Sequence, residues 1–575
     1  MMNDTPTPDR RELFRTLAAL GIGSAIFHRS LAAEVAQQPK DDKPSGVTVE
    51  MVKNAEWVAG LTLTDDERKA VAGALTRTVA GYAKVRKVEL AYGVQPAVQF
   101  SPMSVPELIA SKAYEHWGKP TAKVDAPKLD IKKPESNDDL AFLGVAKLAN
   151  LVRTKQASSV ELTKLALERL KKYDPALLCV VSLTEELAMK QAKQADEEIA
   201  AGKYRGPLHG LPWGAKDLIA YPGYKTTWGA EHYKDQTYPT KAAVAIKLEA
   251  AGAVLVAKLT LGALALGDVW FGGMTRNPWN VKQGSSGSSA GSACSVAAGL
   301  VPFAIGSETL GSIVSPATRC GVTGLRPTFG RISRAGCMTL SWSMDKLGPL
   351  TRSVEDAAIV FGAIHGADVD DPASITMPFQ WPTTRKLSEL RLGYVEGRKT
   401  VEERAELKVL KELGVKLVPI ELPSKLPVDA LRIILDAECA AAFDDITRQG
   451  VNEGIGRFWG TTFRVGQFVT AVEYIRANRI RTLLMQEMAK VMKQVDCYVG
   501  GNDLLVTNLT GHPSVCLPNG FTKTGDIEVP TAITFTGQLY GETELLAVAQ
   551  AYQVATGHHL KRPPMDKVTK DNAKL

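Results

Sequence analysis

The 25 residues from Gln283 to Ser307 carry no charge, and 17 of them are glycine, serine or alanine. Their serine hydroxyls are groups that could do chemistry. A flexible linker, a phosphate-binding loop, or a segment whose backbone approaches a reacting group would each explain this composition. Residues 293–299 have the character of a buried helix, which argues against a linker. No lysine followed by serine or threonine comes after the last glycine, as a Walker-type phosphate loop requires.

The segment 287–291 also fits the pattern G-x-S-x-G, the nucleophile elbow of α/β-hydrolases. In that interpretation Ser289 attacks the substrate and a downstream histidine such as His512 is the base. The elbow requires a strand directly before it. Residues 276–282 are expected to form a loop, so this interpretation is disfavoured.

A second short motif, Ser343 followed by Lys346, fits the S-x-x-K pattern of the penicillin-binding enzymes. The serine of that pattern opens a helix. Here Gly348 and Pro349 follow closely and oppose a helix. Chance is therefore the better explanation of this match.

Longer motifs, spread over much of the chain, fit one family pattern. They are the Gly/Ser run 284–292, the segment Glu308 to Ser312, Cys320 to Thr328, Gly206 to Pro212 followed by Lys216-Asp217, Asn508 to Ser514, and Gly541 to Leu546. Through these motifs, residues 140–560 resemble the amidase signature family. The resemblance implies an α/β fold with a large mixed β-sheet core covered by helices on both faces.

The resemblance also implies a catalytic triad of serine, cis-serine and lysine. The family motifs place the nucleophile at Ser312, the cis-serine at Ser288, 24 positions earlier, and the lysine at Lys216, 96 positions before the nucleophile. Ser288 would relay a proton between the other two. No metal and no cofactor is implied.

Lys216 can act as a base only if its pKa is pulled toward neutrality. Burial destabilises the ammonium form, and the apolar segment 211–215 directly before this lysine suits burial. Asp217 need not cancel the effect, because adjacent residues of a strand face opposite sides.

The family's oxyanion loop corresponds to the backbone amides of Thr309, Leu310, Gly311 and Ser312. Each donor lost from such a hole costs on the order of 10²–10³ in rate. Two positions depart from the usual family pattern: Val314 replaces an arginine and Glu308 replaces the commoner aspartate.

Strand and helix patterns alternate along the chain and indicate the elements that position these residues. Strands are expected at 179–183, 211–219, 254–256, 392–395 and 416–420, and helices at 185–201, 241–251 and 401–413. Ser158 with Glu161 predicts a capped helix start, and Thr64 before three acidic residues predicts another. The alternation favours an α/β fold with buried strands.

The predicted domain order is an export signal at 1–33, a helical extension and linker at 34–139, a catalytic domain at 140–562 and a polar tail at 563–575. The signal prediction rests on Arg10-Arg11, followed by an apolar run too short to span a bilayer of roughly 30 Å and a small-x-small cleavage pattern. It resembles a twin-arginine signal, although leucine precedes the aromatic residue instead of following it. The predicted location is the periplasm, or the cytoplasm if this interpretation is wrong.

The composition of the chain argues against several classes of binding partner. The net charge of +7 is spread thinly without a basic block, which argues against nucleic-acid binding. No stable membrane insertion is expected. Seven scattered cysteines without a C-x-x-C pair are predicted to be buried free thiols, and eight histidines show no zinc-type spacing.

The sequence therefore predicts an enzyme that hydrolyses an amide carbon–nitrogen bond of a small molecule through an acyl-enzyme on Ser312, releasing ammonia or an amine. One alternative is the glutamine-hydrolysing A subunit of a glutamyl-tRNA amidotransferase, and another is a non-catalytic amidase-like binding protein. A homodimer is left open. The substrate pocket is expected from Trp270-Phe271, Trp342 and parts of 430–475, with aromatic or apolar acyl groups as the guess for the substrate.

Overall fold

The computed structural model describes residues 46–90, 97–98, 124–396, 401–500, 503–525 and 527–573. The expected export signal lies outside these residues, as do the parts of the expected extension at 34–45, 91–96 and 99–123. The chain divides into two compact units. Unit 1 contains residues 46–89, 429–451 and 457–477, and unit 2 contains the other described residues.

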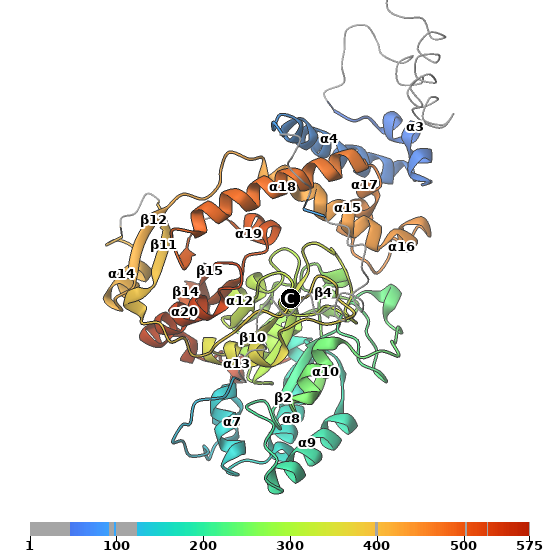
Figure 1. The fold of residues 1–575 in the computed structure, drawn as a ribbon. Coiled ribbons are helices and arrows are strands. Elements are labelled where there is room, and N and C mark those ends of the chain that lie inside the picture. Colours follow the sequence, from blue (N-terminus) through green and yellow to red (C-terminus); the bar gives the residue numbers. More distant parts are fainter. Residues whose placement is uncertain are drawn as a thin grey trace, which may run out of the picture. The chain divides into compact units, whose positions relative to one another are not determined.

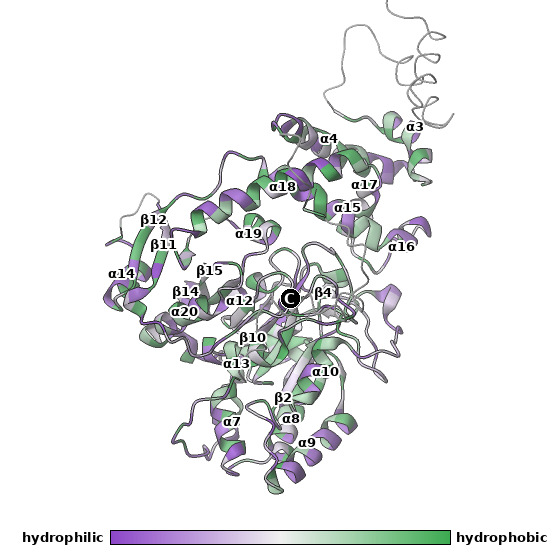
Figure 2. Ribbon diagram, in the orientation of Figure 1, coloured by the Kyte–Doolittle hydropathy of each residue, from purple (hydrophilic) through white to green (hydrophobic). Residues whose placement is uncertain are grey.

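Unit 1 is helical (Figure 1). Its helices are α3 (Val49–Ala59), α4 (Asp65–Arg86), α15 (Ile433–Ala442), α16 (Asp444–Arg448), α17 (Arg457–Gly466) and the first residues of α18 (Ala471–Met492), with a 3-10 turn at Val428–Arg432. The predicted helix start at Thr64 is confirmed: Thr64 and Glu67 form a reciprocal capping box. Hydrophobic and hydrophilic residues alternate around α4 (Figure 2), and its apolar stripe packs with Val52 and Val465 in one small core.

Unit 2 is built on one mixed sheet of 11 strands with the order β1-β3-β2-β8-β10-β9-β14-β15-β13-β11-β12. The strands are β1 (Val180–Leu183), β2 (Pro212–Lys216), β3 (Val254–Leu259), β8 (Phe303–Glu308), β9 (Thr323–Arg326), β10 (Lys346–Thr351), β11 (Arg391–Val395), β12 (Lys416–Ile420), β13 (Cys497–Val499), β14 (Ser514–Thr524) and β15 (Ile527–Gly537). Two small antiparallel sheets pair β4 (Val269–Trp270) with β5 (Gly273–Met274), and β6 (Arg276–Asn277) with β7 (Asn280–Gly284).

Helices pack around this sheet. They are α6 (Asn137–Ala141), α7 (Val145–Arg153), α8 (Ser159–Leu177), α9 (Glu185–Ala200), α10 (Ala243–Ala250), α11 (Ala290–Ala297), α12 (Val314–Cys320), α13 (Val354–Ile364), α14 (Ala405–Glu412), α19 (Leu504–Thr510) and α20 (Glu542–Thr556). Short 3-10 turns lie at Glu231–Tyr233, Ala263–Ala265, Leu387–Glu389, His558–Leu560 and Met565–Lys567. The predicted α/β fold with a large mixed sheet is confirmed.

Most sequence patterns predicted the bounds of these elements within a few residues. One helix and one strand are shorter than predicted. The helix expected at 401–413 begins only at Ala405, because Arg404 has an extended backbone and its guanidinium binds the Val395 carbonyl and the Glu406 carboxylate. The strand expected at 211–219 ends at Lys216, where the amides of the next turn fold back onto the Lys216 carbonyl.

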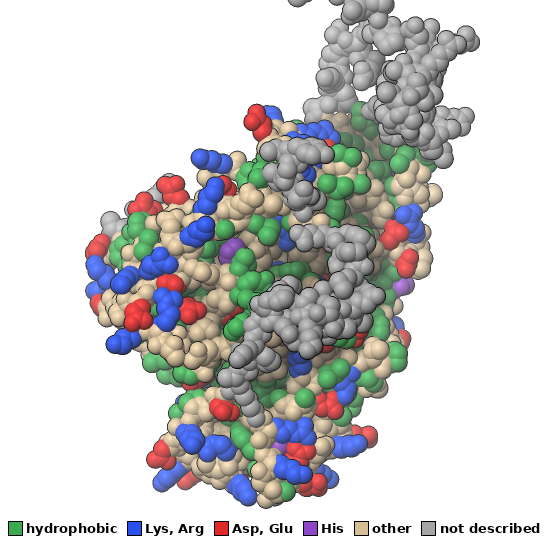
Figure 3. Space-filling model, in the orientation of Figure 1, with side chains coloured by type: hydrophobic (Ala, Val, Ile, Leu, Met, Phe, Trp, Pro, Cys, Tyr) green, Lys and Arg blue, Asp and Glu red, His purple; other side chains and the backbone are tan. Residues whose placement is uncertain are grey.

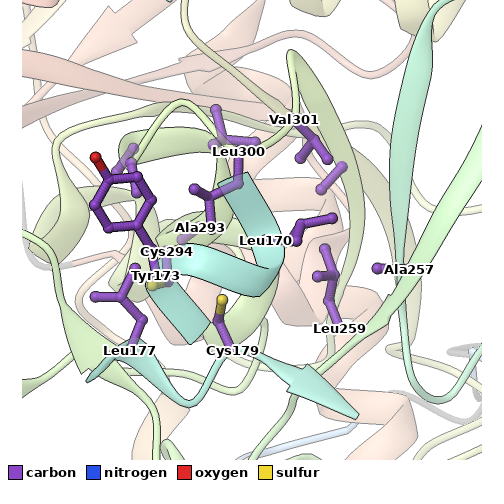
Figure 4. Packing of buried hydrophobic residues seen from close by; sticks show 14 of the residues in the cluster. Leu170, Tyr173, Leu177, Cys179, Ala257, Leu259, Ala293, Cys294, Leu300 and Val301 are labelled. Carbon is purple, nitrogen blue, oxygen red and sulfur yellow. The ribbon is translucent and has the colours of Figure 1, made fainter. Parts of the chain in front are cut away.

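One hydrophobic core of unit 2 is built from side chains of α8, α11, β3 and neighbouring segments, and Figure 4 shows part of it. Tyr173, Leu177 and Leu259 pack there with the thiols of Cys179 and Cys294. All seven cysteines are free and six are buried, which confirms the prediction of buried thiols. This core packs α11, which directly follows the Gly/Ser run, against the sheet.

Acidic and basic side chains are interspersed on the face of the molecule drawn in Figure 3. Within the described ranges, no helix combines the length and the apolar character needed to cross a bilayer. The same residues contain no group of histidine, cysteine and acidic side chains arranged to hold a metal ion.

Candidate active site

Lys216 is the last residue of β2, and it lies at the carboxyl end of that strand next to the parallel strand β8. Its side chain is fully buried. The Nζ atom donates to the hydroxyl oxygens of Ser288 at 2.8 Å, Ser307 at 2.9 Å and Ser289 at 3.1 Å. A buried amine surrounded by hydroxyls can exchange protons with them.

Ser288 begins the turn that leads into α11, and it is buried. The Gly287–Ser288 peptide bond is cis, as the resemblance implies. A Cβ atom added at Gly287 would lie 1.8 Å from the carbonyl oxygen of Gly267. Only glycine therefore allows the loop around Gly267 to approach this turn so closely.

Ser312 lies in the loop between β8 and α12 and is 8% exposed, more than the nearly inaccessible Lys216 and Ser288. The Ser289 amide donates to the Ser312 carbonyl at 3.1 Å and joins this loop to the turn of Ser288. Among the described residues, no hydrogen bond links the hydroxyls of Ser288 and Ser312. The structure thus pairs Lys216 with Ser288 directly and brings Ser312 to the same place through the backbone.

The loop 309–312 presents its backbone amides. Within the described ranges of the chain, the amides of Thr309, Leu310, Gly311 and Ser312 have no hydrogen-bond acceptor. Gly311 has a φ of +87°, a left-handed conformation that favours glycine. Free amides in a rigid loop can stabilise an oxyanion.

Glu308 fixes that loop. Its carboxylate accepts from the amides of Ile313 at 2.9 Å and Val314 at 3.0 Å, and it pairs with the Arg326 guanidinium at 2.7 Å, both side chains being fully buried. Although burial raises the pKa of Glu308, the attraction of Arg326 outweighs it and lowers the pKa to about 2. This glutamate is therefore ionised and can hold the amides that open α12.

Burial lowers the pKa of Lys216 to about 7, and the negative charges of Asp345 and Glu308 oppose a larger shift. Asp217 does not act on it, because its carboxylate pairs with Lys258 at 2.6 Å and accepts from Thr227. The expectation that Asp217 need not cancel the effect of burial on Lys216 is confirmed, although Asp217 lies just beyond the end of β2 and not within the strand. A lysine with this pKa is neutral in a large fraction of molecules near pH 7 and can accept a proton.

Ser289 and Ser307 were not singled out as partners of Lys216 by the sequence patterns. The Ser289 hydroxyl donates to the Ser307 carbonyl and accepts from the Ser307 amide, both at 3.1 Å. The signal that could have found Ser307 is its place near the end of β8, the strand that pairs with the strand of Lys216. Ser289 is thus a buried structural link, which argues against it as a nucleophile.

The elbow interpretation was disfavoured because a loop was expected at 276–282, and that expectation was wrong. Residues 276–284 form the short hairpin of β6 and β7, closed by the two-residue turn of Pro278 and Trp279. The elbow interpretation is still excluded, because its two reacting groups are otherwise engaged. The His512 ring pairs with the Thr510 hydroxyl, and Ser289 is fully buried.

The S-x-x-K alternative also fails on geometry. Ser343 lies in a turn, not at a helix start, and Arg481 binds both its hydroxyl and its carbonyl at 2.8 Å. Lys346 lies in β10, where it pairs in register with Glu308.

Parts of the expected substrate pocket lie beside the site. The loop that contains Trp270 and Phe271 approaches the cis peptide through Gly267, and Phe271 is 38% exposed. Trp342, 51% exposed, precedes Asp345, whose carboxylate accepts from the Thr309 hydroxyl. Most of the segment 430–475 belongs to unit 1.

Comparison with known proteins gives consistent matches. The family model described as Amidase matches residues 161–500. The A subunit of the glutamyl-tRNA(Gln) amidotransferase of Coxiella burnetii is 31% identical over 73% of this chain and 99% of its own length, and that of Methylococcus capsulatus is 32% identical over 73% and 98%. The solved peptide amidase from Stenotrophomonas maltophilia is 30% identical, covers 73% of this chain and 98% of its own, and has a TM-score of 0.64.

The names of the curated relatives match the amidotransferase alternative more directly than the small-molecule interpretation, with which the comparisons are also compatible. The matched family region leaves α3 and α4 outside it.

Proposed function

The chain belongs to the amidase family and is an enzyme that acts on an amide carbon–nitrogen bond, and we propose that it does so through an acyl-enzyme on Ser312. The hydrogen bond of 2.8 Å from Lys216 to Ser288 is the observation that supports this proposal most strongly. Of the three triad residues, Lys216 can be a base near neutral pH, and this hydrogen bond joins it to Ser288, whose hydroxyl would relay the proton.

The proposed reaction proceeds in two steps. Neutral Lys216 accepts the proton of Ser288, Ser288 accepts that of Ser312, and the Ser312 oxygen attacks the amide carbonyl. The amides of the loop 309–312 hold the oxyanion. The proton then returns through Ser288 to the leaving nitrogen, which departs as ammonia or an amine, and water releases the acyl group by the same route in reverse.

The test is labelling of the full chain with a serine-directed fluorophosphonate, followed by peptide mapping. Ser312 is expected to carry the label, and the Ser312→Ala variant is expected to stay unlabelled and inactive while keeping its fold. Label on Ser289, or full amide turnover by the Ser312→Ala variant, would overturn the mechanism.

For the substrate, the first candidate is an amide with an aromatic or apolar acyl group. Exposed Phe271 and Trp342 support it, together with the match to a peptide amidase. The second candidate is glutamine, with the chain as the A subunit of a glutamyl-tRNA amidotransferase, which the names of the curated relatives support.

A panel of acetamide, benzamide, a peptide amide and glutamine, given to the purified chain alone, separates the two candidates. Turnover of benzamide or the peptide amide without partners supports the first. Turnover confined to glutamine, and stimulated by added amidotransferase B and C subunits, supports the second.

We also propose export through a twin-arginine signal, on the strength of Arg10-Arg11 and the short apolar run after them. Export would conflict with a role in translation. Replacing both arginines with lysine is expected to hold the precursor in the cytoplasm, and unchanged secretion would refute the proposal.

A further inference from the structure

Asp345 directly precedes β10 and lies near two parts of the active site, the loop 309–312 and Lys216. Its Oδ1 accepts from the Thr309 hydroxyl at 2.5 Å, and its Oδ2 accepts from the amides of Leu340 and Ser341 at 2.8 and 2.9 Å. Thr309 is the first residue of the oxyanion loop, and only 7% of it is exposed. The carboxylate therefore holds one end of the loop, while Glu308 holds the amides at the other end.

Asp345 is also close to the lysine. A small cavity is lined in part by Ser307, Thr309, Asp345 and Lys346, and the Ser307 hydroxyl that borders it accepts from Lys216 Nζ at 2.9 Å. Ser307 thus lines the same cavity as Asp345 and also accepts from Lys216, and at such a buried site charges interact more strongly than in water. Of the charges that act on Lys216, that of Asp345 raises its pKa most.

Other charged groups near these two residues have partners of their own, and Arg481 donates to the Ser343 hydroxyl and carbonyl. On β3, Lys258 pairs with Asp217; on β8, Glu308 pairs with Arg326; and Arg334 pairs with Asp371. Lys346, on β10, lies beside Asp345 and donates to the Met344 carbonyl. Burial lowers the pKa of Lys346 well below its usual value. Burial also raises the pKa of Asp345, and the hydrogen bonds from Thr309, Ser341 and Leu340, together with the charge of Arg334, oppose this rise and favour the carboxylate.

We propose that Asp345 is a positioning residue for the amidase reaction: it anchors Thr309 at the start of the oxyanion loop and supplies the negative charge that stabilises protonated Lys216. The inference rests on the proposed function, because it assigns Asp345 a role toward Lys216 and the loop 309–312. It also gives the Thr309 side chain a task in a loop whose backbone amides face the substrate.

Two substitutions separate the anchor from the charge. Asp345→Asn keeps an oxygen for the amides of Leu340 and Ser341 and an NH2 group that can donate to Thr309, but it removes the charge. Thr309→Val removes the anchored hydroxyl and keeps the charge, with Thr309→Ser as its matched control because serine retains the hydroxyl.

The experiment measures the rate of fluorophosphonate labelling of Ser312 in the full chain from pH 5 to pH 9. In the Asp345→Asn variant, the midpoint of the rise in rate is expected at least half a pH unit lower than in the unmodified protein. In the Thr309→Val variant, the midpoint is expected to stay while the maximal rate falls at least tenfold, and the Thr309→Ser variant is expected to retain most of the rate.

An Asp345→Asn midpoint equal to that of the unmodified protein would overturn the proposal. Equal maximal rates in the two Thr309 variants would also overturn it, and this comparison remains decisive if the Asp345→Asn variant fails to fold. Absence of label on Ser312 in the unmodified protein would instead be a failure of the proposed function, so the two failures are distinguishable.

Discussion

Lys216 and Asp217 are neighbours in the chain, yet each is fully buried with its own set of partners. The Lys216 amine donates to Ser288 at 2.8 Å, whereas the Asp217 carboxylate accepts from Lys258 at 2.6 Å. Lys216 is thus buried among neutral hydroxyls, whereas Lys258 is buried in an ion pair with Asp217. Because burial alone favours a neutral amine and an ion pair favours a charged one, two lysines of the same unit have different chemistry.

Replacing Lys216 with methionine is expected to affect activity, whereas replacing Lys258 with methionine is expected to affect stability. Lys216→Met should abolish amide turnover with little loss of stability, because no carboxylate loses a direct partner. Lys258→Met leaves the Asp217 carboxylate buried without its cation and should reduce the free energy of unfolding by about 3–5 kcal/mol. Urea unfolding and amide turnover, measured on both variants, check this; a Lys216→Met protein that turns over amides would contradict it.

Activity should depend on pH through Lys216. Because its pKa is lowered to about 7, the amine is protonated below that pH and cannot accept a proton, so kcat/KM should fall about tenfold per pH unit on the acid side. Above pH 7 it should reach a plateau. A pH profile of kcat/KM between pH 5 and 9 measures the midpoint, and a rise that continues to pH 9 without a plateau would rule out this burial effect.

The loop anchor at Glu308 should tolerate a change of length better than a loss of charge. Glu308→Gln can still accept from the amides of Ile313 and Val314, but it leaves the Arg326 guanidinium buried without its anion, which costs about 3–5 kcal/mol. Glu308→Asp keeps the charge and serves as the control. Thermal unfolding should show the larger loss for Glu308→Gln, and equal losses in the two variants would argue against the ion pair as the main contribution.

Gly287 and Gly73 should respond to alanine in opposite ways. At Gly287 the new Cβ would lie 1.8 Å from the Gly267 carbonyl oxygen, so the loop must move and activity should be lost. At Gly73, on the exposed side of α4, nothing lies within 4 Å, and alanine should stabilise that helix by about 0.5–1 kcal/mol. Activity and melting temperature of the two variants check this, and an active Gly287→Ala protein would contradict the close approach.

The sequence predicted the α/β architecture and the triad candidates because their signals are local or carried by motifs. Lys216, Ser288 and Ser312 stand in recognisable patterns, and the structure brings them to one place. Asp345 is different: it reaches the site only because β10 pairs antiparallel with β8, so that Lys346 lies opposite Glu308. No local pattern encodes such a pairing, which joins residues 38 positions apart.

The hairpin at 276–284 was missed for a related reason. Its strands are only two and five residues long, are mostly polar, and are separated by Pro278 and Trp279. Apolar alternation, the usual strand signal, needs a longer run with one buried face. Here the pairing of backbone groups, not a hydrophobic pattern, makes the strands.

Unit 1 joins the beginning of the described chain to a segment far along it. Leu75 of α4 shares a small core with Val465, about 390 residues later, and Glu67 pairs with Arg464 at 2.8 Å. During synthesis at about 5–20 residues per second, α3 and α4 would therefore wait roughly 20–80 s for the helices that complete their core. Although α3 and α4 are translated long before those helices, they would reach their final packing only after them.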